Sequence, residues 1–155
     1  MKKYELIPEG NLFRIRALKD FGCIKKGDLG GLVESEYNLS HEGNCWIYND
    51  AKVFENAKVF GNAEVFGNAI VCGNAKVYEN AEVFRNAKVF ENAIVCGNAE
   101  VYGSAKVCGN AEVYENAWVY ENALVYGSAK VFGNAEVFGN AEVYENAVIL
   151  NHYSW

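Results

Sequence analysis

A six-residue pattern of apolar and polar positions runs without a break through most of this chain. Each unit reads Ala, a variable residue, Val, an aromatic residue or Cys, Gly or Glu, and Asn, as in residues 57–62. Ala recurs at every sixth position from Ala51 to Ala147, and Val keeps the third position from Val53 to Val143, with Ile149 closing the series. Because strand side chains alternate between two faces, Ala and Val are expected to point inward. A strict six-residue period is typical of a parallel β-helix.

The repeat predicts an all-β fold, a single-stranded parallel β-helix of about six coils, because three units make one triangular coil. The Asn that ends each unit is expected at the corner, since Asn tolerates a positive φ better than most side chains and the preceding Gly is freer still. Ser104 and Ser128 replace this Asn, and both follow a Gly. Pro8 is the only proline, so no repeat residue lacks a backbone N–H.

The chain divides into three segments by this pattern. Residues 1–44 lack the repeat, and the alternation of residues 12–18 followed by the turn cluster at 27–31 predicts a hairpin-like cap over the open end of the first coil. Residues 45–150 form the β-helix, beginning with a degenerate unit in which Ile47 takes the Val position and Trp46 and Tyr48 point outward. Residues 151–155 leave the pattern and form a short tail.

The three outer faces differ when every third unit is compared. Between Ala and Val, two faces carry mainly Lys and aliphatic residues, whereas the third carries Glu at four of five positions and Trp118 at the other. After Val, the third face has an unbroken series of rings, while Cys72, Cys96 and Cys108 interrupt the other two. The candidate interface or ligand-binding residues are those of the third face: Glu64, Phe66, Glu82, Phe84, Glu100, Tyr102, Trp118, Tyr120, Glu136 and Phe138.

Two interpretations of the third face stand side by side. Stacked rings stabilise a parallel sheet by about 0.2–1 kcal/mol per pair, so the series could be structural alone. Yet monomers seldom expose contiguous apolar patches, and a column of Glu at strand spacing repels itself. Both problems vanish if this face docks on a Lys-bearing face of a second copy. Such a head-to-tail contact closes into a ring, and three subunits are expected.

Charge and cysteine content narrow the class of protein. The net charge of −6, carried mostly by residues 51–155, argues against general nucleic-acid binding. The five cysteines show no zinc spacing, so we expect free thiols, no metal and no cofactor. The chain has no long apolar run, which predicts no membrane segment and no export signal. Free thiols without an export signal suit a reducing compartment, so we expect a location in the cytoplasm.

The N-terminal segment offers a second candidate site. Five basic residues lie near aromatic residues in the sequence, and together they would form an anion-binding patch able to hold a nucleotide. The residues of this possible patch are Arg14, Arg16, Lys19, Lys25 and Lys26. The alternative is that the segment only covers the first coil.

The residues at 14–21, 26–31 and 38–48 resemble the start of YdcK-like hexapeptide-repeat proteins, which occur in enterobacteria and in phages and prophages. With the repeats, the resemblance covers almost the whole chain. It implies a left-handed coil, like that of bacterial hexapeptide acyltransferases. Members are often labelled transferases because of their fold, but the family supplies no catalytic motif to place on this sequence.

Three functions remain open. The first is a non-catalytic homo-oligomer that holds a ligand or protein partner at subunit seams; if phage-borne, it would sequester a host nucleotide signal or a defence protein. The second is an acyltransferase, which needs a base within hydrogen-bonding reach of its substrate; only His41 and His152 are available, and both lie outside the regular units. The third is a purely structural scaffold. We favour binding over catalysis, because fold alone does not establish an activity.

Overall fold

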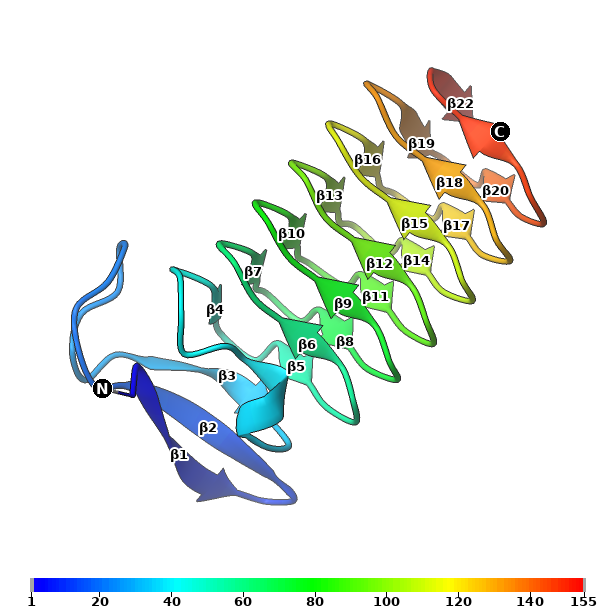
Figure 1. Cartoon of the computed structure of the whole chain (residues 1–155). Helices are drawn as coiled ribbons and strands as arrows, with labels where there is room; N and C mark the ends of the chain where they lie inside the picture. The colour runs from blue at the N-terminus through cyan, green and yellow to red at the C-terminus, as the bar shows by residue number, and fades with distance from the viewer. Residues whose placement is uncertain (1, 155) are drawn as a thin grey trace.

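The chain folds into a single column of stacked coils. The computed structural model describes the backbone of residues 2–154 and the side chains of residues 2–151. It is a parallel β-solenoid of about seven turns with an 18-residue spacing between coils. Figure 1 shows the coils stacked along one axis, with the two chain ends at opposite ends of the stack. The all-β parallel fold predicted from the repeat is therefore confirmed.

Three sheets form the sides of the column, and each coil contributes one short strand to each sheet. The first sheet runs in the order β1 (Tyr4–Glu9), β2 (Leu12–Ala17), β3 (Leu29–Val33), β5 (Lys52–Val53), β8 (Ile70–Val71), β11 (Lys88–Val89), β14 (Lys106–Val107), β17 (Leu124–Val125) and β20 (Glu142–Val143). The second contains β6 (Lys58–Val59), β9 (Lys76–Val77), β12 (Ile94–Val95), β15 (Glu112–Val113), β18 (Lys130–Val131) and β21 (Val148–Ile149). The third contains β4 (Trp46–Ile47), β7 (Glu64–Val65), β10 (Glu82–Val83), β13 (Glu100–Val101), β16 (Trp118–Val119), β19 (Glu136–Phe138) and β22 (His152–Ser154). We call their outer surfaces the first, second and third face.

The core is a narrow column of small side chains. Ala and Val are buried in every unit from Ala51 to Val143, as the alternation predicts. Neighbouring coils are joined by backbone bonds: the N–H of Lys58 donates to the carbonyl of Ala75 at 3.0 Å, and that of Phe60 donates to the carbonyl of Val77 at 3.1 Å. Full burial of a Val side chain stabilises the fold by about 1.5–3 kcal/mol, so this column is the main source of stability.

The first coil is built by residues that lack the repeat. Val33, Leu39 and Ile47 pair in register with the Val residues of the next coil, at positions 53, 59 and 65. The stack therefore begins at Leu29 and has one coil more than the regular units indicate. The 3₁₀ helix η1 (Glu36–Asn38) lies between the first two of these strand positions, and the buried side chain of Asn38 donates to the carbonyl of Ala57 at 2.8 Å.

Residues 2–28 extend the first sheet and pack on the first coil. Strands β1 and β2 form an antiparallel hairpin, and β2 pairs antiparallel with β3. Trp46 lies at an outward position in β4, yet it is fully buried because the rings of Tyr4 and Phe21 contact its edge. In the described part of the chain, no helix has the length and apolar character needed to cross a membrane.

A buried lysine ties this segment to the first coil. Lys3 is fully buried, and its ammonium group donates to the carbonyl of Cys45 at 2.8 Å and to that of Gly43 at 3.3 Å. The same group lies 4.8 Å from the centre of the Phe21 ring. Desolvation by burial lowers the pKa of Lys3.

The corners differ from the sequence-based expectation. The residue with positive φ is the fifth of each unit, not the Asn that follows it. At eight such corners this residue is not Gly, and φ lies between 56° and 60°, as at Glu79 and Glu115. The Asn prediction was wrong because the strand already ends before the fifth residue, and the backbone turns the corner at that residue.

Gly alternates with Glu, or with Asn49 and Arg85, up each corner except where Gly follows Gly, so that no two non-Gly residues meet across neighbouring coils. The carboxylate of Glu79 accepts the N–H of Gly97 at 2.9 Å, and Glu91 accepts that of Gly109 at the same distance. A Cβ added to Gly97 would lie 2.7 Å from the backbone nitrogen of Glu115. The alternation therefore supplies the space at each step, and a hydrogen bond wherever Gly follows Glu or Asn49.

The Asn residues form ladders of side-chain amides. Asn74 donates to Asn92 at 3.1 Å, and Asn92 donates to Asn110 at 3.2 Å. A second ladder joins Asn98 to Asn116 at 3.2 Å. The sixth position is thus Asn because its amide both donates and accepts along the stack axis.

Candidate functional site: the third face

The third face brings together all ten residues predicted for it. Glu64, Glu82, Glu100, Trp118 and Glu136 pair in register along one column. Beside it, the five rings from Phe66 to Phe138 stack with centroids 4.6–5.3 Å apart and planes within 3–10° of parallel. On the other two faces the described stacks are isolated pairs, such as Phe60 with Tyr78. The third face therefore has the longest continuous aromatic surface among the described residues.

Tyrosine hydroxyls stabilise part of the glutamate column by hydrogen bonding. The hydroxyl of Tyr48 donates to Glu64 at 3.1 Å, and that of Tyr120 donates to Glu136 at 2.9 Å. In both pairs the Tyr precedes its Glu by sixteen residues. Burial and then the hydrogen bond to Glu136 raise the pKa of Tyr120 to about 12, so it remains a donor at neutral pH.

The centre of the face lacks these hydrogen bonds. The rings sixteen residues before Glu82 and Glu100 are phenylalanines, Phe66 and Phe84, which have no hydroxyl to donate. Neither carboxylate has a hydrogen-bond or ion-pair partner among the described residues. Burial raises the pKa of Glu82, and the neighbouring charges of Glu100 and Glu64 raise it further. Two half-buried carboxylates thus lie side by side without a cation.

An aromatic side chain lies next to these carboxylates. Trp118 follows Glu100 in the column and has 39% of its surface exposed. A carboxylate pair next to an exposed indole suits a cation, because the carboxylates supply charge and the indole supplies a π face. A Lys or Arg side chain on a partner surface has this chemistry.

The lower end of the third face is hollowed. A depression of about 370 Å³ is lined by Tyr48, Glu64 and Phe66 from the coils, together with Cys23 and Asn49. Cys23 is exposed, and all five cysteines are free thiols, as expected. The depression would admit an apolar side chain from a surface docked on the face.

The structure pairs the two arginines of the possible anion patch with carboxylates. Arg14 forms ion pairs with Glu9 at 2.5 Å and Asp50 at 3.4 Å, and Arg16 forms one with Glu5. Their positive charges are directed at protein groups of the same hairpin and first coil. The three lysines, Lys19, Lys25 and Lys26, follow in the loop after β2; the backbone N–H groups of the last two donate to Asp28 and Asp20.

Two histidines are the candidates for acyl transfer. His41 has a hydrogen-bond partner on each ring nitrogen, and the side chain of His152 lies outside the described residues. The Nδ1 atom of His41 accepts the backbone N–H of Lys3 at 3.1 Å, so Nε2 carries the proton and donates to Glu36 at 2.7 Å. The neutral ring therefore has no free acceptor nitrogen, and it stacks on Tyr4 with centroids 4.1 Å apart. His152 belongs to β22, where its side chain lies outside the described part.

The cysteines of the repeat are poorly suited to nucleophilic catalysis. Burial raises the pKa of the thiols of Cys72, Cys96 and Cys108, so little thiolate is present at neutral pH. Within residues 2–151, no three His, Cys, Asp or Glu side chains are grouped so that they could hold a metal ion.

The fold and this face define a parallel β-solenoid with one acidic, aromatic side. Neither a scan against protein-family models nor a search of curated proteins gives a match to the chain.

Proposed function

We propose that the chain is a non-catalytic binding and assembly protein whose third face docks on the first face of a second copy. The observation that carries the proposal is the pair of unpartnered carboxylates, Glu82 and Glu100, beside a continuous stack of rings. An uncompensated acidic pair on an apolar surface is unfavourable in a free monomer and favourable against a cationic partner.

The first face offers two cations, one at the height of Glu100 and one at that of Trp118, while Glu82 lies level with Ile70, one coil from Lys88. Lys88 and Lys106 are adjacent and in register on β11 and β14. Lys88 belongs to the same coil as Glu100, and Lys106 to the same coil as Trp118. When two copies lie side by side with parallel axes, Lys88 therefore faces Glu100, and Lys106 faces the indole of Trp118. The second face is less suitable, because Tyr37 of η1 protrudes there over Lys58.

A contact between two different faces produces a ring if the rotation closes. The three sides of a coil are equally long, so docking of whole faces turns each copy by about 60° and closes with about six copies. A contact limited to the corner between the faces allows the three subunits expected from the sequence. The mass of the assembly distinguishes the two arrangements.

Charge exchange tests the proposed contact. Glu100→Lys and Lys88→Glu each place like charges opposite each other, so native mass spectrometry should show monomers for either single variant and the wild-type assembly for the double variant. Lys130→Glu on the second face is the matched control and should leave the assembly intact. A monomeric wild-type protein, or a double variant that stays monomeric while the control assembles, would refute the proposed contact.

The resemblance to YdcK-like proteins supports the finer parts of the proposal. It favours a left-handed coil and a cytoplasmic role in a bacterium or a phage-infected cell. In that setting the assembly would hold a host nucleotide signal or a defence protein at its subunit seams. Native mass spectrometry of protein purified from such cells would reveal a retained ligand as extra mass, and protein that is always bare would argue against sequestration of a small molecule.

A further inference from the structure

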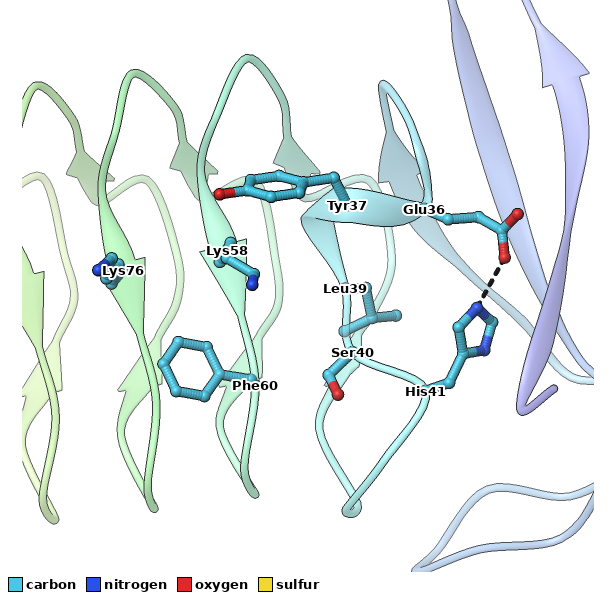
Figure 2. A pocket seen from close by; sticks show the side chains of 8 residues that line it. All are labelled: Glu36, Tyr37, Leu39, Ser40, His41, Lys58, Phe60 and Lys76. Carbon is cyan, nitrogen blue, oxygen red and sulfur yellow. Dashed lines mark hydrogen bonds and ion pairs between the residues drawn. The ribbon is translucent and has the colours of Figure 1, made fainter. Parts of the chain in front are cut away.

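A second hollow lies on the second face, between η1 and the first regular coils. It has a volume of about 380 Å³ and is lined by Glu36, Tyr37, Leu39, Ser40, His41, Lys58, Phe60 and Lys76. Figure 2 shows Tyr37 at one side of the hollow, Phe60 at the other, and the two lysines between them. Its size is within the range of small-molecule sites.

One end of this hollow is cationic. Lys58 and Lys76 are in-register partners on β6 and β9, so their like charges lie about one strand spacing apart. Neither ammonium group has an ion-pair partner among residues 2–151, and that of Lys58 lies 4.7 Å from the centre of the Tyr37 ring. An anion between the two lysines would remove their repulsion and accept hydrogen bonds from both.

The aromatic column of the second face lacks a ring in the coil before Phe60. Phe60 stacks on Tyr78 with centroids 4.7 Å apart, which is the repeat distance of the column. In the coil before Phe60 the equivalent position is Ser40, because Leu39 pairs with Val59 and the N–H of Ser40 donates to the Val59 carbonyl. A small residue therefore occupies a place that a ring would fill, and the stack ends at Phe60. A planar group of a ligand would fit at this place.

The opposite end of the hollow is polar. Ser40 Oγ accepts the N–H of Glu42 at 3.0 Å, which leaves the hydroxyl proton for another acceptor. Glu36 is fixed by His41 and by Lys2 at 3.1 Å, and the hydrogen bond from His41 is the main cause of its lowered pKa. The carboxylate of Glu36 is thus ionised and can accept hydrogen bonds from a ring with amino groups. It also disfavours an anion at this end.

We propose that this hollow binds a small anion bearing a planar nitrogen ring, of the nucleoside monophosphate class. The phosphate lies between Lys58 and Lys76, the ring continues the aromatic column below Phe60, and its polar edge meets Ser40 and Glu36. The second face stays open in the ring of subunits proposed above, so the site extends the binding role to a small molecule and does not depend on assembly.

Isothermal titration calorimetry with AMP tests this site. Lys58→Gln and Lys76→Gln should each weaken AMP binding by about tenfold, since each removes one charge-assisted contact. Lys130→Gln, on the same face several coils away, is the matched control and should bind as the wild type does. Ser40→Phe fills the vacant ring position and should abolish binding while the thermal stability is kept.

A comparison of several ligands tests the two ends of the hollow separately. Adenosine and inorganic phosphate should each bind at least about tenfold more weakly than AMP, because each satisfies only one end. No heat of binding from AMP, GMP, CMP or UMP at millimolar concentration would overturn the proposal, as would equal binding by wild type and Ser40→Phe. Glu100→Lys, which disrupts the proposed ring, should retain AMP binding, so failure of the assembly and failure of the site are distinguishable.

Discussion

The corner glycines give the sharpest test of how the coils fit together. Gly97 has φ of +66°, and its Cα faces the backbone of the next coil so closely that an added Cβ would lie 2.7 Å from Glu115 N and 3.1 Å from its Cα. Backbone atoms in a bonded ladder cannot move aside as a flexible side chain can. Gly97→Ala therefore combines a conformational cost of about 1–2 kcal/mol with an overpacking cost of about 1–3 kcal/mol.

Gly10 is the matched control for the conformational part of this cost. It has nearly the same φ, +63°, but an added Cβ would meet nothing within 4 Å. Gly10→Ala should therefore lower the free energy of unfolding by only about 1–2 kcal/mol. Urea unfolding followed by circular dichroism, at one protein concentration, measures both variants. With a slope of about 2 kcal/mol/M, the midpoint of Gly97→Ala should lie about 0.5–1.5 M below that of Gly10→Ala. Equal midpoints would refute the reasoning that coil-to-coil contact demands glycine.

Three further predictions concern polar groups. Lys3→Met should lower the free energy of unfolding by about 2–4 kcal/mol, because buried carbonyls of residues 43 and 45 lose their donor; a urea midpoint equal to the wild type would contradict this. The melting temperature of Glu36→Gln should lie below that of the wild type at pH 7. The lowered carboxyl pKa of Glu36 contributes stability that is lost as pH falls through the folded-state pKa, so the difference in melting temperature should close as pH falls below about 4.5. A difference that persists at pH 2 would assign the effect to packing. Asn92→Ala removes two side-chain hydrogen bonds of its ladder and should lower the free energy of unfolding in urea by about 1 kcal/mol. Asn56→Ala, outside the described ladder bonds, should lower it less. Equal losses would show that the ladder adds no stability.

The coil interior could be predicted from sequence because it repeats one local rule. Ala and Val at fixed positions can only point inward when strand side chains alternate, and all of them from Ala51 to Val143 are buried. The corner prediction fails because the tolerance of Asn for positive φ does not determine which residue of the unit takes the corner. The signal that corrects it is present in the sequence, since Gly alternates with Glu or Arg85 at 18-residue spacing in the fifth position of most units, while the sixth position is Asn except at Ser104 and Ser128.

The first coil and the second-face hollow depend on contacts that no local pattern encodes. Val33 and Leu39 take the inner positions without the repeat, and the capping box of η1, in which Ser35 and Asn38 exchange hydrogen bonds with backbone N–H groups, sets the position of Tyr37. The third face was predictable as two columns. Its central feature, the two carboxylates without Tyr donors, follows from the sixteen-residue spacing between Tyr and Glu, which only the coil geometry reveals.

The alternation at the corners also limits how such a chain can change its length in evolution. Removal or duplication of one coil would place Glu directly on Glu at a corner whose backbone has positive φ, whereas two coils restore the alternation. The alternation breaks at Gly109 and Gly127, and there Gly faces Gly, the combination that needs no space for a side chain. The chain is therefore expected to change its length by two coils at a time. A change by a single coil is tolerated only where glycine meets glycine.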